Sequence, residues 1–285
     1  MVALLAIGVA ACIISVATPG HAYQVQIQPS SPQLGDTLSI TVQAENSRSG
    51  RAPAITMNSQ TYPTFPLAAN QFRALIPTSP LDRPNQRLEI KVTGEEETRN
   101  LAVWLGNRSF PTQRITLPPG KAGLSGTDYE FDRVAAFKQL VTPEKFWNGP
   151  MLRPSQGRVS SIYGVRRYYN GVFAENYYHR GVDYAASTGT PIVAPAAGRI
   201  ALVGREADGF RLHGNTVGID HGQGVAGIFI HMSRIDVAEG DFVQAGQVIG
   251  RIGSTGSATG PHLHWGLYVH GVAVDPVPWR YDGIE

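Results

Sequence analysis

The chain has 285 residues, of which 42% are hydrophobic and 16% are charged, and its formal net charge is +2. This length is about twice that of an ordinary domain, so two domains can each bury a core. The near-neutral charge and the scattered arginines give no compositional support to nucleic-acid binding, and we expect no nucleic-acid partner.

Residues 1–22 are predicted to be a secretory signal peptide. The apolar run 2–16 is followed by Gly20 and Ala22, small residues at the positions where signal peptidase would cut. The run is shorter than the roughly twenty apolar residues of a membrane-spanning helix. It is atypical in one respect, because it contains no Lys or Arg. We expect a periplasmic or secreted protein of the cell envelope.

The only cysteine, Cys12, lies in this apolar run. Its context resembles a lipoprotein signal, but the residues that follow stay apolar, so we favour ordinary cleavage over lipidation. Cleavage after Ala22 would leave a mature chain without a thiol. Disulfides, thiolate ligands and cysteine nucleophiles are then excluded, which leaves histidine and carboxylate chemistry.

Residues 23–118 are predicted to form an immunoglobulin-like β-sandwich that serves as an accessory domain. The run Pro-Gln-Leu-Gly-Asp-Thr-Leu-Ser-Ile-Thr-Val, which starts at Pro32, is typical of the opening strands of such a fold. The segment contains no histidine and no catalytic constellation. Its expected strands, separated by Pro, Gly and Asn, cover residues 23–27, 37–43, 88–92, 101–104 and 113–117.

Residues 119–153 are predicted to be a linker that contains one short helix over residues 132–140. The helix would begin with Asp132 as its cap and end before Pro143. Such a linker either packs against the C-terminal domain or lies across its surface as a lid, and we favour packing.

Residues 154–285 are predicted to form an antiparallel β domain. Turn residues separate short apolar runs, and no long stretch has a clean amphipathic helical period. We expect a sheet or sandwich with a groove across one face, which suits a ligand bound as an extended chain. The expected strands cover residues 191–203, 216–220, 227–231, 248–253 and 262–269.

Histidines and one aspartate of this domain have the spacing of a metal site. Alternate side chains of a strand share a face, so His262 and His264 can both enter one cleft. His179 and Asp183, four residues apart, complete three protein ligands with one member of that pair, and this leaves a fourth position for water at a catalytic zinc ion. The other member of the pair, with His231, would then move protons or stabilise an oxyanion.

The order of these motifs resembles peptidase family M23, a family of zinc endopeptidases. The chain contains His-x-x-x-Asp at 179–183, an apolar residue followed by His-x-Ser at 230–233, and Ser-Thr-Gly-x-x-x-Gly-Pro-His-Leu-His at 254–264. The resemblance covers about the C-terminal half, and the combination of motifs makes it specific. Further matching segments are residues 161–166, 189–198 and 240–250.

The resemblance implies an endopeptidase with one zinc ion per chain that hydrolyses the stem or cross-link peptides of bacterial peptidoglycan in cell wall remodelling. Carried over position by position, it assigns His179, Asp183 and His264 as zinc ligands and His231 and His262 as catalytic histidines. Some family members that have lost ligands activate other hydrolases. The alternative is therefore a wall-binding or activator protein that regulates another cell wall hydrolase, and a regulatory protein partner stays open.

Three other kinds of site are rejected. The loop with Gly253, Gly256 and Gly260 lacks the Gly-Lys-Ser/Thr ending of a phosphate loop, so no nucleotide is expected, and we place this loop at the rim of the groove. A serine hydrolase would need a Gly-x-Ser-x-Gly elbow, which is missing there. Residues 190–200 and 240–250 resemble a biotinyl or lipoyl carrier, but no lysine follows Lys145.

The remaining histidines of the domain, His213, His221 and His270, are predicted to be structural. His221 and His270 each precede a glycine turn, and a lone histidine in a strand is more often hydrogen-bonded or at the surface than a ligand.

Overall fold

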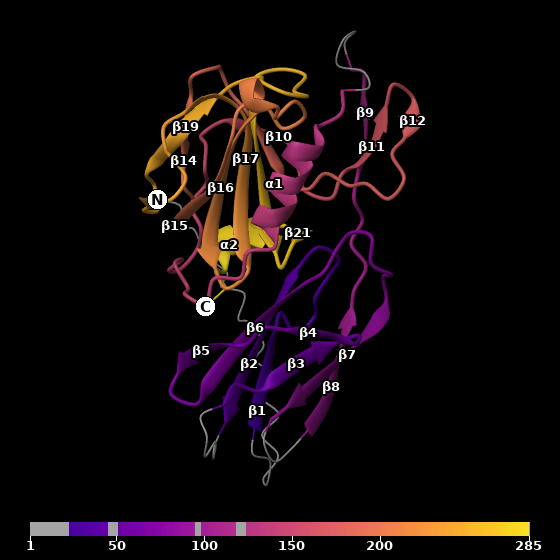
Figure 1. Ribbon diagram of the computed structural model, residues 1–285. Coiled ribbons are helices and arrows are strands. Elements are labelled where there is room, and N and C mark those ends of the chain that lie inside the picture. Colours follow the sequence, from indigo (N-terminus) through magenta and orange to yellow (C-terminus); the bar gives the residue numbers. More distant parts are fainter. Residues whose placement is uncertain (1–22, 45–50, 95–97, 118–123, 285) are drawn as a thin grey trace, which may run out of the picture.

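The computed structural model describes residues 23–44, 51–94, 98–117 and 124–284, and these form two bodies of β-structure (Figure 1). The predicted signal peptide and Cys12 lie outside the described residues. Within the described ranges, no helix is long and apolar enough to cross a bilayer.

The N-terminal body consists of two four-stranded antiparallel sheets, in the orders β1-β2-β6-β5 and β4-β3-β7-β8. This order confirms the predicted immunoglobulin-like sandwich, in which the strands A, B, E and D make one sheet and C, F and G the other. The sheets share one core, to which Leu38 and Ile40 come from the first sheet and Ile55 and Ile90 from the second. The strands are β1 (Tyr23–Gln28), β2 (Thr37–Ala44), β3 (Ala54–Met57), β4 (Gln60–Tyr62), β5 (Phe65–Ala68), β6 (Gln71–Pro77), β7 (Gln86–Thr93) and β8 (Thr98–Leu105).

The C-terminal body is built on one ten-stranded antiparallel sheet. Its main path is β10-β13-β20-β17-β16-β15-β18, and β14, β19 and β21 are attached to it. Its strands are β10 (Arg158–Ser161), β13 (Val182–Ala185), β14 (Pro191–Val193), β15 (Gly198–Gly204), β16 (Asn215–Gly222), β17 (Val225–Ile235), β18 (Phe242–Val243), β19 (Val248–Ile252), β20 (His262–Val269) and β21 (Val272–Val274). A short helix, α2 (Pro276–Tyr281), follows them, and a 3-10 turn, Glu206–Asp208, follows β15.

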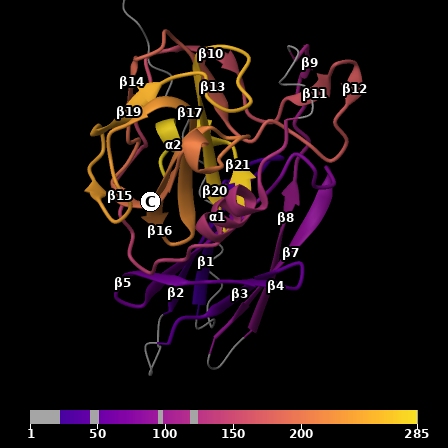
Figure 2. The same cartoon turned by 45° about the horizontal axis from the view of Figure 1, so that its top comes forward.

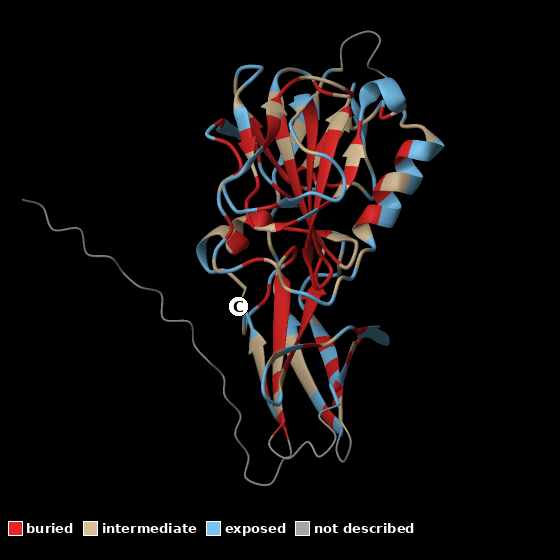
Figure 3. Ribbon diagram, turned by 60° about the vertical axis from the view of Figure 1, so that its left-hand side comes forward, coloured by how far each residue is buried: buried red, intermediate tan, exposed pale blue. Residues whose placement is uncertain are grey.

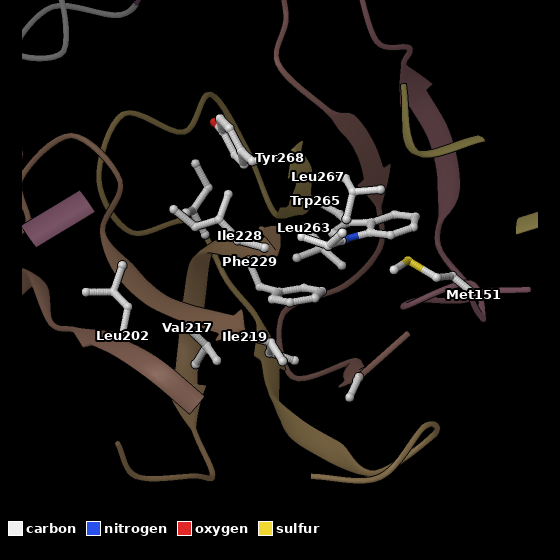
Figure 4. Close-up of a cluster of buried hydrophobic side chains, with 14 of the residues drawn as sticks. Met151, Leu202, Val217, Ile219, Ile228, Phe229, Leu263, Trp265, Leu267 and Tyr268 are labelled. Atoms are coloured by element: carbon white, nitrogen blue, oxygen red, sulfur yellow. The ribbon is translucent and has the colours of Figure 1, made fainter. Parts of the chain in front are cut away.

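The core of this body lies against one face of the sheet. Leu263, Trp265 and Leu267 alternate along β20 and are fully buried there together with Phe229 (Figure 4). Because side chains alternate along a strand, His262 and His264 face the opposite side. In Figure 3 the buried residues run along the central strands. One face of β20 therefore packs in the core, and the opposite face, which carries His262 and His264, is available for a site.

Most of the predicted strands are present, but one of them is split into two strands. The predicted strand 262–269 coincides with β20, whereas the predicted strand 191–203 is two strands, β14 and β15. Pro195 lies in the break between them, where its missing N–H cannot join a sheet. Strand β13, which carries Asp183, was not predicted, because its run Val-Asp-Tyr-Ala is short and contains a charge.

The helix of the linker differs from its prediction. Helix α1 (Asp128–Lys138) begins four residues before the predicted start, because Thr127 and not Asp132 caps it by accepting a hydrogen bond from the Glu130 amide. Val134 and Phe137 are buried in the core of the C-terminal body, and α1 packs on β15. The segment therefore packs against the domain, as we favoured.

A small three-stranded sheet stands beside the C-terminal body (Figure 2). Its order is β12-β11-β9, and β9 runs parallel to β11. Strand β9 lies in the range that we predicted for the N-terminal domain, yet it joins neither sandwich sheet. Its members are β9 (Thr112–Ile115), β11 (Arg166–Tyr169) and β12 (Val172–Phe173).

Candidate active site and metal centre

His179, Asp183 and His264 converge in the C-terminal body. His179 Nε2 lies 3.0 Å from Asp183 Oδ1 and 3.0 Å from His264 Nδ1, and His264 Nδ1 lies 2.9 Å from Asp183 Oδ1. One ligand atom from each residue lies within 4.8 Å of the other two. The side chains are only 1%, 10% and 12% exposed, so the cluster is shielded but not sealed. Two imidazoles and one carboxylate at this spacing fit a metal ion that keeps a fourth position open.

Sheet register brings the aspartate and the histidine together. Asp183 of β13 and His264 of β20 are direct antiparallel partners. His179 precedes β13 and is fixed by its backbone, since its amide donates to the Val165 carbonyl and its carbonyl accepts from the Gly164 amide. These two backbone hydrogen bonds thus hold His179 against the segment that carries the Ser-Ile-Tyr-Gly-Val-Arg motif.

Hydrogen bonds orient the rings. His179 Nδ1 lies 2.7 Å from the Ile162 carbonyl oxygen, an acceptor, so Nδ1 carries the proton and the lone pair of Nε2 points into the cluster. His264 instead turns its Nδ1 toward Asp183. A metal ion would therefore meet Nε2 of His179 and Nδ1 of His264.

Arg167 contacts the outer oxygen of the aspartate. Its Nη2 lies 3.3 Å from Asp183 Oδ2 and 3.1 Å from Ser161 Oγ, while its Nε donates to Gln113 Oε1 at 3.2 Å. Burial alone would raise the pKa of Asp183, but the adjoining His179 and His264 hold that pKa well below its usual value. The carboxylate is thus ionised, with Oδ1 directed at the histidines and Oδ2 held by the arginine.

His231 and His262 stand beside this cluster. Their ring centroids are 4.8 Å apart, and His262 Nε2 is 4.0 Å from Asp183 Oδ1. Each Nδ1 faces a backbone carbonyl, that of Thr255 at 2.9 Å for His231 and that of Gly260 at 2.8 Å for His262. Both rings therefore keep Nδ1–H as a donor and offer the Nε2 lone pair elsewhere.

A β-bulge places His231 in the site. Thr216 of β16 stands opposite two residues of β17, Ile230 and His231, and His231 has a φ of +66°. In a regular strand neighbouring side chains face opposite sides, yet both residues line the same cavity here. A left-handed backbone at a histidine is strained, and the His231 amide is held by the His213 carbonyl at 3.0 Å.

Burial keeps two of these rings uncharged. It lowers the pKa of His264 to about 4, although Asp183 opposes the shift. It also lowers the pKa of His231 well below its usual value, an effect reinforced by the nearby His262 and His264. Neutral imidazoles can bind a metal ion or accept a proton.

The five residues line one groove of about 640 Å³, so the predicted groove is present. The predicted loop also borders it, through Ser257, Thr259 and Gly260. An open groove on a sheet can take an extended peptide.

Sequence reasoning missed several residues of this groove. Lys138, Arg167, Tyr177 and Arg180 line it, but no motif spacing marks them. His213 is hydrogen-bonded, as predicted for a structural histidine, with Nδ1 2.6 Å from Glu130 Oε1, and it also lines the groove.

The other two structural histidines lie elsewhere. His221 donates from Nδ1 to the Ala197 carbonyl at 2.9 Å, and His270 packs against Tyr62 of the N-terminal body.

Residues 177–276 match the family model described as peptidase family M23. The chain is 42% identical over 120 residues to the DD-carboxypeptidase/endopeptidase Mpg of Neisseria meningitidis, a match that covers 42% of this chain and 26% of that protein. It is 39% identical over 119 residues to the peptidoglycan DD-endopeptidase ShyC of Vibrio cholerae, covering 42% and 26%. The match therefore spans about a quarter of the length of these relatives.

One solved structure resembles nearly the whole chain. A crystal structure of a putative peptidase M23 from Pseudomonas aeruginosa superposes with a TM-score of 0.63 at 26% identity. The superposition covers 89% of this chain and 96% of that one. The likeness thus includes the N-terminal sandwich as well as the domain with the groove.

Proposed function

We propose that the chain, whose residues 177–276 match peptidase family M23, is a zinc-dependent endopeptidase that hydrolyses peptide bonds in the stem or cross-link peptides of peptidoglycan. The observation that carries the proposal is the convergence of His179, Asp183 and His264 with two further histidines in one groove. The names of the relatives, which include a peptidoglycan DD-endopeptidase, support the substrate class.

The metal of this proposal is zinc, one ion per chain, held by His179, Asp183 and His264. Two nitrogen donors and one oxygen donor form a set that zinc commonly accepts in catalytic sites. Bound there, zinc supplies Lewis-acid activation of water and of the peptide carbonyl. The chain contributes the hydrogen bonds that orient the ligands: His179 Nδ1–H donates to the Ile162 carbonyl, and Arg167 donates to Asp183.

His231 and His262 are the catalytic histidines of the proposal. Each has its Nδ1 proton engaged by a backbone carbonyl, so each presents Nε2 as a proton acceptor. One ring accepts a proton as water attacks, and a protonated ring can stabilise the oxyanion and return the proton to the leaving amine.

We also propose that the protein works in the periplasm or outside the cell, within the envelope. The support is the apolar run 2–16 followed by small residues, together with a substrate class that lies outside the cytoplasm.

The test is incubation of the mature chain with isolated peptidoglycan, with and without a chelator, followed by mass spectrometry of the released fragments. We expect new peptide termini that vanish with the chelator and return when zinc is added. Protein that binds the wall and releases no peptide under any of these conditions would contradict the endopeptidase and favour a wall-binding or activator role. Release that is insensitive to the chelator would contradict the metal site.

A further inference from the structure

One end of the groove carries two positive charges. Lys138, the last residue of α1, and Arg180, which follows His179, both line the groove together with Tyr268. His264, Gly266 and Tyr268 share one face of β20, and the backbone of Arg180 and the side chain of Ile228 pack closely over Gly266. Tyr268 lies four residues after His264 in β20, which is about 13 Å along the strand.

The side chains of this end are held in place. Lys138 Nζ lies 4.4 Å from the centroid of the Tyr268 ring, and Arg180 Cζ lies 5.3 Å from that of Tyr177. Figure 4 shows Tyr268 directed away from the buried cluster around Trp265. The aromatic faces contact the two cations, and neither side chain donates a hydrogen bond to another residue in the described ranges.

Neither cation has an acidic partner in the described part of the chain, where no carboxylate oxygen lies within 4.0 Å of Lys138 or Arg180. By contrast, Arg133 on the same helix pairs with Glu239. Burial, and then the charge of Arg180, lower the pKa of Lys138 to about 8. Two like charges in a partly buried groove repel each other, and a bound anion would relieve that repulsion.

We propose that Lys138 and Arg180 form a subsite that binds a carboxylate of the substrate peptide. The inference rests on the proposed function, since it assumes that a peptide lies in the groove. The bound carboxylate belongs to a residue within about four positions of the cleaved bond, because an extended peptide rises about 3.3 Å per residue. Charge-assisted hydrogen bonds from both cations then fix the direction of the peptide across the metal centre.

The proposal gives the linker a role in recognition. Lys138 comes from α1, which is fixed to the domain by Val134 and Phe137 in the core. Lys138 is the residue of α1 that lines the groove.

The test compares two synthetic stem peptides that differ only in one side-chain carboxylate, free in the first and amidated in the second. Dissociation constants are measured by calorimetry on the mature chain carrying His262→Ala, so that turnover does not interfere. KM and kcat are measured on the otherwise native chain. Lys138→Met and Arg180→Gln remove one charge each, and Arg133→Gln is the control, because it removes a charge of the same helix outside the groove.

We expect the His262→Ala chain, with Lys138 and Arg180 unchanged, to bind the free acid at least about tenfold more tightly than the amide. A difference of this size is the usual effect of a charge-assisted hydrogen bond. Lys138→Met and Arg180→Gln should each abolish most of this preference and raise KM for the free acid with little change in kcat, whereas Arg133→Gln should keep it. Thermal unfolding checks that each variant is folded.

The two proposals fail differently. Chelator-sensitive hydrolysis without a preference for the free acid, or a preference that survives both substitutions, overturns the subsite and leaves the endopeptidase standing. Binding that prefers the free acid without any hydrolysis supports the subsite and contradicts the endopeptidase. If neither peptide binds, the subsite is wrong.

Discussion

Asp183 and His264 are direct partners across the antiparallel strands β13 and β20, and Asp183 Oδ1 lies 2.9 Å from His264 Nδ1. Both strands have neighbours on either side in the sheet. The relative position of the two ligands is thus set by a backbone ladder and not by flexible loops, which is the arrangement that a preorganised site needs.

The two histidines of the His-Leu-His motif should differ in their effect on the metal. His264→Ala removes one of three ligands, so we expect loss of both zinc and hydrolysis. His262→Ala should keep most of the zinc while lowering kcat by about 10²- to 10⁴-fold, since it removes only a proton-transfer group. Metal content after dialysis and single-turnover rates measure the two effects. Equal loss of zinc in both variants would refute this division of roles.

Arg167 should strengthen metal binding without contacting the metal. Its guanidinium holds Asp183 Oδ2, so Arg167→Gln should weaken zinc affinity about 10- to 100-fold, the usual range for the loss of an outer partner. Competition with a coloured chelator measures the affinity, and excess zinc should restore much of the activity.

Arg114→Gln is the control for this experiment, because Arg114 stacks on Tyr168 of the same small sheet and does not line the groove. Unchanged zinc affinity in Arg167→Gln would show that the arginine does not position the ligand.

The left-handed backbone of His231 should affect the free energy of unfolding of variants at this position. A residue with a Cβ at φ of +66° is strained, and glycine is not. We therefore expect His231→Gly to be more stable than His231→Ala by about 1 kcal/mol in urea unfolding, although both lose the imidazole.

The same two substitutions at Ser233 give the matched comparison. Ser233 is exposed in the same strand and is absent from the described residues with positive φ, so alanine should be the more stable variant there. The same order of stability at both positions would argue against strain at His231.

Glu130 should make stability depend on pH. Burial would raise the pKa of this carboxylate, but hydrogen bonds from the His213 ring and from the amides of His213 and Leu212 lower it below its usual value near 4.5. A depressed pKa stabilises the fold above the unfolded pKa. This contribution is lost as pH falls from about 4.5 through the lower folded value.

Urea midpoints measured across this range should fall more steeply for the native chain than for Glu130→Gln, which has no carboxylate to titrate. Asp132→Asn, an exposed acid of the same helix, serves as the control and should keep the native slope. Parallel curves for the native chain and Glu130→Gln would show that the carboxylate does not stabilise the loop beside the groove.

The sequence by itself indicated β-structure in both halves of the chain and singled out the four histidines and one aspartate that the fold brings into one groove. Alternation along residues 262–269 needs only local information, because side chains on a strand switch faces at every residue. The order of the three histidine motifs can likewise be recognised from the linear sequence alone.

Tertiary structure alone decided which side chains surround these five. Strand β13 is too short to be recognised locally and exists because β10 and β20 pair with it on both sides. The bulge that turns His231 into the groove depends on the register between β16 and β17. Arg167 and Lys138 reach the groove from separate segments, a strand of the small sheet and a helix of the linker. Such placements arise from pairing and packing between residues far apart in the chain, and no local pattern of spacing encodes them.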